Sequence, residues 1–382
     1  MIYNKIKELI ANTKAINTHS HHFEDTFFID FNIDKLLVNT YINWSGVSFD
    51  SSKESRQNYI DKVSFKSYYK WLQKALKEIY KISEDLSPGN WDYYSEAISS
   101  SYKDNEWHKK ILKDYCNYEK VIIDAYWNPG SNNKDPEIFT STFRIDPLFF
   151  GYNKDTFDHD GNNVFSLYNR EFTDFDSYIL FIRELITAKI KNGCIALKNA
   201  IAYDRCINYE ETSKVKAQQV FKDKEHITKI EVKQFQDYIF YEICKLAAEL
   251  NVPIQCHTGM GCLEKTNALN MLNIIKTNPD TKFVLFHGGF PWDGDILGLL
   301  HACQNVYPDI CWLPLLSPTF AERTLHQLIE VGTAEKICWG CDTWTSEESY
   351  GARLALNDVL ASVLSKKIEK EYFSINDAEC II

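Results

Sequence analysis

The residues of this chain best suited to metal chemistry begin at the motif Asn17-Thr-His-Ser-His21, which follows a short apolar run. Successive side chains of a β-strand point to opposite faces, so His19 and His21 would project from the same face. Two imidazoles placed in this way can bind one divalent ion, and imidazole suits zinc and its first-row neighbours. The pair alone is weak evidence because His-x-His also occurs in loops, so further ligands must come from elsewhere in the chain.

Four more polar side chains occupy the same kind of position, directly after an apolar run: Lys198, His257, His287 and Asp342. A single histidine at such a position is usually structural. Its repetition at several strand ends favours a shared site, in which imidazoles and a carboxylate converge on a metal ion and leave room for water.

The elements that would position these residues alternate between short apolar strands and amphipathic helices, which indicates parallel βαβ architecture. Strands are predicted near residues 16, 122, 144, 195, 254, 284, 311 and 338, the seventh over residues 310–315. We therefore expect an α/β fold, a (β/α)8 TIM barrel, rather than an open doubly wound sheet. The active site of such a barrel lies at the carboxyl ends of its strands, where the polar residues stand.

Residues 43–118 interrupt this alternation with a helical, aromatic and charged pattern that contains no strand-like run. We interpret them as a helical insertion after the first strand of one barrel that spans residues 1–382. Both ends of the insertion would leave from the carboxyl face, so we expect it to cap the barrel mouth or to form a dimer interface.

Composition excludes several classes of function. The 382 residues carry 42 Lys and Arg against 53 Asp and Glu, a formal charge of −11, which argues against a nucleic-acid surface or an anionic membrane as partner. No run approaches the roughly 20 apolar residues of a membrane span. The charged start at residues 1–9 lacks the apolar core of a signal peptide, so we expect a cytoplasmic protein with reduced cysteines.

Around the polar strand-end residues named above, the sequence resembles the amidohydrolase superfamily. The resemblance is closest to the amidohydrolase 2 branch, with its aminocarboxymuconate-semialdehyde-decarboxylase-like proteins, and to the amidohydrolase-like half of glutamine-synthetase fusion proteins. It covers both ends of the chain and most of residues 190–382, and leaves residues 43–118 outside. The matching motifs are Asn17-Thr-His-Ser-His21, Leu197-Lys-Asn-Ala-Ile-Ala-Tyr-Asp-Arg205, Pro253-Ile-Gln-Cys-His-Thr-Gly259, Phe286-His-Gly-Gly289, Trp339-Gly-Cys-Asp342, Glu348-Ser-Tyr-Gly-Ala-Arg353 and Ile375-Asn-Asp-Ala378.

The resemblance implies a metal-dependent barrel enzyme in which His19, His21, His257 and Asp342 are the metal ligands. Asp342 would also act as general base toward a metal-activated water. His287 corresponds to a histidine that binds a second metal or stands beside the substrate, where it could steady an oxyanion or pass a proton.

Lys198 allows several interpretations. In some branches of the superfamily the corresponding lysine is carboxylated and bridges two metals, which would give two ions per chain. It could instead contact a substrate carboxylate together with Arg205, or pair with an acid of the protein. Because Arg205 could bind a carboxylate in bidentate geometry, we expect an unmodified Lys198 and one divalent ion, most simply zinc.

The predicted function is a metal-dependent hydrolase that acts on a C–N or C–O bond of a small substrate. Lys198, Arg205 and Arg353 near the expected mouth suggest that this substrate carries a carboxylate. A metal-dependent non-oxidative decarboxylase is the first alternative, and a sugar-acid isomerase similar to uronate isomerases is the second. A binding module without activity is disfavoured because none of the ligands is missing. A homo-oligomer is possible, and the sequence does not decide it.

Two further motifs are set aside. Asp158-His-Asp-Gly-Asn162 begins like a calcium loop, but Asn169 stands where an EF-hand needs glutamate, so a polar turn is expected. Cys338-Trp-Gly-Cys341 has no second such pair, and no redox or structural-zinc role is expected of it.

Overall fold

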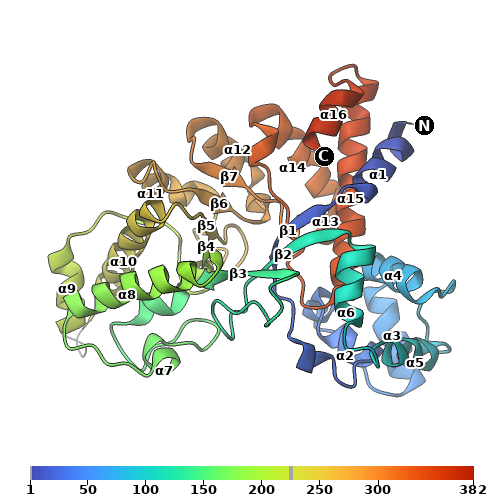
Figure 1. Ribbon diagram of the computed structural model, residues 1–382, viewed down its shortest axis with the longest axis horizontal. Coiled ribbons are helices and arrows are strands. Elements are labelled where there is room, and N and C mark those ends of the chain that lie inside the picture. The colour runs from blue at the N-terminus through green and yellow to red at the C-terminus, as the bar shows by residue number, and fades with distance from the viewer. Residues whose placement is uncertain (1, 223–226) are drawn as a thin grey trace.

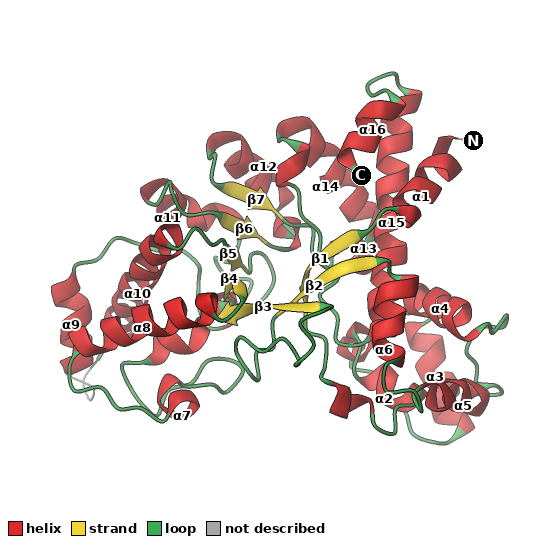
Figure 2. Ribbon diagram, viewed as in Figure 1, coloured by secondary structure: helices red, strands yellow, loops and turns green. Residues whose placement is uncertain are grey.

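The computed structural model describes residues 2–222 and 227–382. Its central element is a parallel sheet of seven strands. The strands are paired in chain order, each parallel to the next, and they lie at the centre of the molecule (Figure 2). Their bounds are β1 Ala15–Ser20, β2 Tyr118–Ile123, β3 Phe139–Arg144, β4 Cys194–Asn199, β5 Ile254–Cys256, β6 Phe283–Leu285 and β7 Val306–Pro308.

Helices surround this sheet (Figure 1). They are α1 Ile2–Asn12, α2 Ile33–Val38, α3 Lys53–Val63, α4 Ser67–Tyr80, α5 Trp91–Ser101, α6 Trp107–Lys110, α7 Val164–Tyr168, α8 Phe175–Lys191, α9 Lys214–Lys222, α10 Lys229–Glu249, α11 Leu272–Thr277, α12 Asp293–Ala302, α13 Leu313–Leu316, α14 Pro318–Val331, α15 Ser346–Glu369 and α16 Ile375–Ile381. Among the described residues, no helix is both long and apolar enough to cross a bilayer.

Local sequence explains where the long helices begin. Thr228 and Glu231 form a capping box at the start of α10, since each side chain accepts a hydrogen bond from the other's backbone N–H. Asp174 and Ser177 do the same at the start of α8. These contacts satisfy the N–H groups that the first helical turn leaves free. The two helices then place β4 and β5 beside each other.

The edge between β7 and β1 is bridged by residues 338–343. On one side, Cys338 N–H donates to Pro308 O at 2.9 Å and Trp312 N–H donates to Gly340 O at 3.0 Å. On the other side, Asp342 N–H donates to the carbonyl of His19 at 2.9 Å. The segment therefore hydrogen-bonds to both ends of the seven-stranded sheet, which curls round to meet itself.

The strands predicted near residues 311 and 338 differ from the structure. The seventh strand is β7, which ends at Pro308, and the apolar run predicted as a strand over residues 310–315 turns instead into the short helix α13. Trp312 precedes this helix with φ of 65°, and Pro314 stands in its first turn, where its missing N–H costs nothing. The expected eighth strand is reduced to a single bridge between Asp309 and Cys338.

The segment between β1 and β2 is helical, as the pattern of residues 43–118 predicts. It has its own core of buried side chains, including Trp91 and Tyr94. It also packs on α15, where Tyr80 donates a 2.6 Å hydrogen bond to Glu347. In Figure 1 these blue-to-cyan helices lie beside the lower part of α15. That they form a separate insertion stays a prediction.

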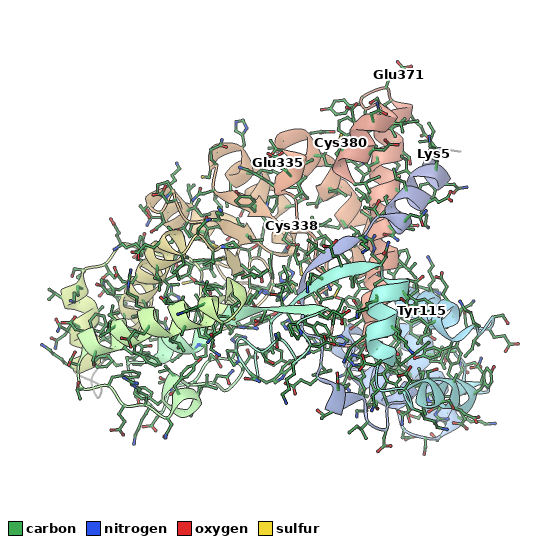
Figure 3. The ribbon with its side chains drawn as sticks, in the orientation of Figure 1. Lys5, Tyr115, Glu335, Cys338, Glu371 and Cys380 are labelled. Atoms are coloured by element: carbon green, nitrogen blue, oxygen red, sulfur yellow. The ribbon has the colours of Figure 1, made fainter. Side chains whose placement is uncertain are left out.

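All eleven cysteines lie within the described ranges and are free thiols. Most are buried, as expected for cysteine that packs as a small apolar residue. Figure 3 labels two that are not fully buried, Cys338 beside the sheet and the exposed Cys380 on α16.

Candidate metal centre

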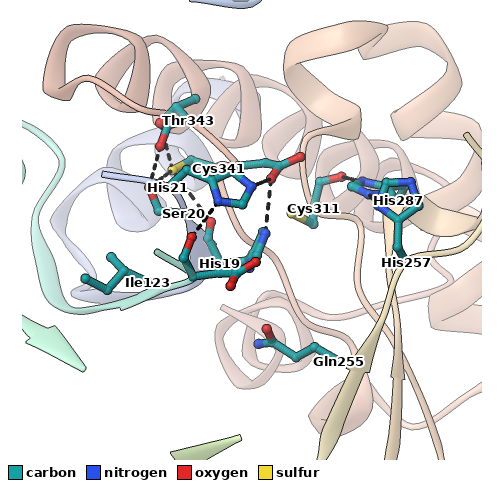
Figure 4. A network of polar contacts seen from close by, with 12 residues as sticks. His19, Ser20, His21, Ile123, Gln255, His257, His287, Cys311, Cys341 and Thr343 are labelled. Atoms are coloured by element: carbon teal, nitrogen blue, oxygen red, sulfur yellow. Dashed lines mark hydrogen bonds and ion pairs between the residues drawn. The ribbon is translucent and has the colours of Figure 1, made fainter. Parts of the chain in front are cut away.

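Three metal-ligating side chains meet where β1 ends. The Nε2 atoms of His19 and His21 each lie 3.2 Å from Oδ1 of Asp342. All three residues are buried, and their ligand atoms lie within 4.8 Å of one another (Figure 4). The same-face placement predicted for the two histidines is thus observed, and the sheet brings Asp342 to them from the other end of the chain.

The rings of both histidines turn Nε2 toward Asp342. His21 Nδ1 lies 2.8 Å from the carbonyl oxygen of Asp124, which can only accept, so this nitrogen carries a proton. Burial, together with the nearby charge of Lys198, lowers the pKa of His19 to about 3. Its Nδ1 is buried, and the described residues offer it no hydrogen-bond partner. A neutral imidazole is the form that binds a metal.

Asp342 is held from both sides. Its Oδ2 accepts a 2.7 Å hydrogen bond from the hydroxyl of Tyr41, which lies in the short 3₁₀ helix η2, Tyr41–Ser45. Burial acts to raise the pKa of Asp342, but the contacts with His19 and His21 outweigh it, and the pKa is well below its ordinary value. The carboxylate is therefore ionised, with one oxygen toward the histidines and the other toward a proton donor.

His257 and His287 form a second pair of imidazoles just after β5 and β6. His287 Nδ1 lies 3.3 Å from the carbonyl of Cys311, and its Nε2 lies 3.0 Å from His257 Nδ1. If His287 donates to that carbonyl, it must accept from His257, whose Nε2 then bears only a lone pair. This Nε2 is buried and has no hydrogen-bond partner among the residues that the structure describes. His257 lies outside the close group of His19, His21 and Asp342, although it lines the same cavity.

Backbone strain marks three positions around this centre. His287, Trp312 and Asp342 have φ of 63°, 65° and 62°, in the left-handed region that residues other than glycine rarely adopt. Such conformations cost on the order of 1–3 kcal/mol each and cluster at functional sites. The fold therefore holds these side chains in place at a cost to stability.

A cavity of about 180 Å³ opens beside His19, His21 and Asp342. Its wall combines aromatic rings with polar groups, so a small polar substrate with an apolar face would fit it. The residues that line it are His19, His21, Tyr41, Trp44, Tyr126, Arg144, His159, Asp160, Lys198, Ala200, Tyr203, His257, Asp342 and Trp344.

Two cations line the cavity, and they differ in their partners. Arg144 lies 2.8 Å from Asp124, 2.9 Å from Asp146 and 3.5 Å from Asp160, so its charge is balanced within the protein. Lys198 is 2% exposed, and its Nζ lies 3.7 Å from the centre of the Phe286 ring. Within the described part of the chain it has no ion pair, and burial lowers its pKa.

The expected contacts of Arg205 and Arg353 with a substrate carboxylate are corrected by the structure. Arg205 points away from the cavity and forms a 2.6 Å ion pair with Asp237 of α10. Arg353 is buried near the opposite end of the sheet, where it donates to the carbonyls of Ile10 and Thr13 at 2.9 and 3.1 Å. Both side chains are engaged in holding helices, and neither lines the cavity.

Several cavity residues escaped the sequence analysis. His159 and Asp160 belong to the segment interpreted as a polar turn, and the structure places both on the cavity wall. Their signal was available, because the turn follows the third strand and carries a histidine between two aspartates. Tyr41 comes from the 3₁₀ helix η2 after β1, and no local pattern marks it. Trp44, an aromatic residue of the helical segment expected to cap the barrel mouth, does line the cavity.

Comparison with known proteins agrees with this geometry. The family model described as Amidohydrolase matches residues 222–376, which contain His257, His287 and Asp342. Over these residues the chain is similar to members of the amidohydrolase superfamily. The match covers β5, β6, β7 and all of α15, where the sequence motifs are densest. Members of this superfamily depend on metal ions, and the group of His19, His21 and Asp342 fits a divalent ion by its donor types.

Two curated relatives share parts of the chain. Protein fluG of Emericella nidulans is 26% identical over 161 residues, 39% of this chain and 19% of the relative. A uronate isomerase of Caldanaerobacter subterraneus subsp. tengcongensis is 31% identical over 122 residues, 31% of this chain and 24% of the relative. The chain therefore spans about a fifth to a quarter of the length of these relatives.

A solved structure matches over nearly the whole chain. Glucuronate isomerase from Caulobacter crescentus superposes with a TM-score of 0.77 at 15% identity, covering 99% of this chain and 90% of that protein. At this identity the likeness concerns the fold alone. It supports the α/β barrel-like architecture and includes the helical segment between β1 and β2.

Proposed function

We propose that this chain is a metal-dependent enzyme that interconverts an aldose and a ketose form of a small sugar acid of the uronate class. The observation that carries the proposal is the double contact of Asp342, with one oxygen toward His19 and His21 and the other toward the hydroxyl of Tyr41. The 31% identity with a uronate isomerase and the fold shared with glucuronate isomerase support this chemistry among those known for the superfamily.

His19, His21 and Asp342 would hold the divalent ion, with His257 Nε2 available from the adjacent wall. When bound, such an ion polarises a carbonyl or hydroxyl oxygen of a substrate. The protein's own contribution is to keep the imidazole of His19 neutral and the carboxylate of Asp342 ionised, which the pKa shifts of these two residues provide.

Tyr41 and Asp342 would move the protons. Isomerisation removes a proton from C2 of the aldose and returns one to C1, while the proton of the C2 hydroxyl passes to the C1 oxygen. Asp342 can accept a proton, and Tyr41, whose pKa is raised by burial and by Asp342, keeps its own proton available for donation. Both groups are within one hydrogen bond of each other and face the cavity.

Lys198 would bind the substrate carboxylate. A buried ammonium without a counter-ion is costly, and no carboxylate of the described residues lies within ion-pair distance of this one. Arg144 cannot take this role without giving up its aspartates. A substrate anion would therefore restore the balance of charge at Lys198.

Hydrolysis of a C–N or C–O bond is the second candidate. It is favoured by the same carboxylate, because Asp342 stands where a general base toward a water molecule is needed. Hydrolysis would use Asp342 without requiring a proton from Tyr41, whereas isomerisation requires one proton transfer between the two carbons and another between their oxygens, and so would use both groups.

The deciding experiment incubates the metal-loaded protein with glucuronate, galacturonate, N-acyl amino acids, lactones and small aromatic acids. Ketose formation, amine or acid release and CO2 release are measured in parallel. We expect ketose formation, lost in Asp342→Asn and retained in the control His326→Ala, a change on the surface helix α14. Hydrolysis or CO2 release without ketose formation would overturn the isomerase proposal in favour of the corresponding alternative.

A further inference from the structure

A second group of possible ligands lies next to the first. The Sγ of Cys311, a ring nitrogen of His287 and a carboxylate oxygen of Asp342 lie within 4.8 Å of one another. All three side chains are buried. Figure 4 shows Cys311 between the cluster of His19 and His21 and the imidazole of His287. Asp342 belongs to both groups, so the two positions would be neighbours that share a carboxylate.

The thiol of Cys311 differs from the buried thiols of Cys341 and Cys194, which have hydrogen-bonding neighbours. Cys341 Sγ accepts from Asn17 at 2.9 Å and lies 3.0 Å from the Thr343 hydroxyl. Cys194 Sγ lies 3.3 Å from the Ser141 hydroxyl. For Cys311 Sγ, by contrast, the described residues supply no hydrogen-bond partner, although the residue is 0% exposed.

The backbone fixes this thiol in place. Cys311 N–H donates to Asp309 Oδ1 at 2.8 Å, and the next residue, Trp312, has the left-handed φ of 65°. The other two members of the group, His287 and Asp342, have the same kind of strained backbone. The three side chains are therefore placed before any ligand arrives, which lowers the entropy cost of binding.

We propose that Cys311, His287 and Asp342 form a second metal position, which takes a thiophilic divalent ion such as zinc. Thiolate with imidazole and carboxylate is a donor set for zinc and cobalt, whereas magnesium and calcium prefer oxygen ligands alone. On binding, the Cys311 thiol gives its proton to solvent and its sulfur bonds to the ion. The ion replaces one of the two hydrogen-bonding contacts of His287. This inference rests on the proposed metal-dependent function, and it adds Cys311 as a ligand.

Cobalt(II) tests the position directly, because thiolate ligation gives a charge-transfer band in the near ultraviolet that imidazole and carboxylate do not give. Metal-free protein is titrated with cobalt(II), and bound cobalt is measured by elemental analysis. We expect the band in the wild type and in Cys303→Ser, which changes a buried thiol away from the site. In Cys311→Ser we expect the band and one equivalent of cobalt to be lost, while the visible bands of the first ion remain.

Several outcomes would overturn the inference. Bound cobalt without a charge-transfer band in the wild type would remove the second position and leave the first intact. A band that persists in Cys311→Ser would assign the thiolate to another cysteine. A wild type that binds no cobalt would overturn the metal-dependent function itself. Should Cys311→Ser fail to fold by circular dichroism, the wild-type spectrum and His287→Asn, which removes the imidazole ligand, decide the question in the same way.

Discussion

The hydroxyl of Tyr41 lies 2.7 Å from Oδ2 of Asp342, although 301 positions separate the two residues in the chain. If this pair moves the substrate's protons, Tyr41→Phe removes the donor and keeps the ring. Because general acid–base catalysis contributes typically 10²–10⁴-fold, we expect kcat to fall by about 100-fold or more. KM and metal content should stay within about twofold of the wild type, as measured by steady-state kinetics and elemental analysis.

Tyr93→Phe is the matched control for this change, since Tyr93 is 61% exposed on α5 and remote from the cavity. It should leave kcat unchanged. A Tyr41→Phe variant with wild-type kcat would show that the hydroxyl only supports the fold, and the proton transfer would then need another donor.

Lys198→Met should weaken binding of the substrate while leaving the metal in place. A hydrogen bond to a charged group contributes about 1.5–3 kcal/mol, so KM for a carboxylate substrate should rise by roughly 10–100-fold. Lys189→Met on α8 is the control, because its ammonium donates to the carbonyl of Pro129 outside the cavity. If the KM of Lys198→Met is unchanged, or if this variant has lost a metal ion, the result would instead indicate that Lys198 is a metal-bridging ligand.

Ionisation of the buried Glu348 carboxyl should make the metal-free protein less stable as the pH rises. Burial raises the pKa of this carboxyl to about 8, whereas it is about 4.3 in an unfolded chain. Between these values the folded state holds more protons than the unfolded state, so stability falls from about pH 4.3 toward about pH 8. Glu348→Gln, which cannot ionise, should show a smaller drop in Tm between about pH 5 and pH 8.

The Glu348→Gln side chain keeps an oxygen for the backbone N–H of Tyr41, which donates to the Glu348 carboxylate at 2.7 Å. The substitution therefore tests ionisation without removing this contact. Glu54→Gln on the exposed surface of α3 serves as control and should follow the wild type at both pH values. Equal drops in Tm for the wild type and Glu348→Gln would mean that Glu348 is ionised in the folded protein at neutral pH.

The parts of the site that local pattern defines were predictable from the sequence. His19 and His21 share a face because a strand alternates with period two, and His257, His287 and Asp342 follow apolar runs whose ends must meet in a parallel sheet. The superfamily followed from the order of these motifs. Each of these inferences needs only residues within a few positions of the side chain concerned.

Properties set by distant partners were not predictable in this way. Residues 310–315 have the composition of a strand, but Trp312 turns the chain and α13 begins there. Arg205 and Arg353 stand near site motifs in sequence, yet Asp237 of α10 and the carbonyls at the end of α1 determine where they point. Tyr41 reaches the cavity only because a helical segment folds back onto Asp342.

Elemental analysis of protein purified without chelators tests most directly whether His19, His21 and Asp342 hold a catalytic divalent ion. We expect about one or more tightly bound ions of zinc or a similar metal per chain in the wild type. His19→Ala should lose the ion and the activity while circular dichroism shows an intact fold. Wild-type protein that is fully active without a metal, or a His19→Ala variant that keeps its ion, would show that His19, His21 and Asp342 do not hold a catalytic ion.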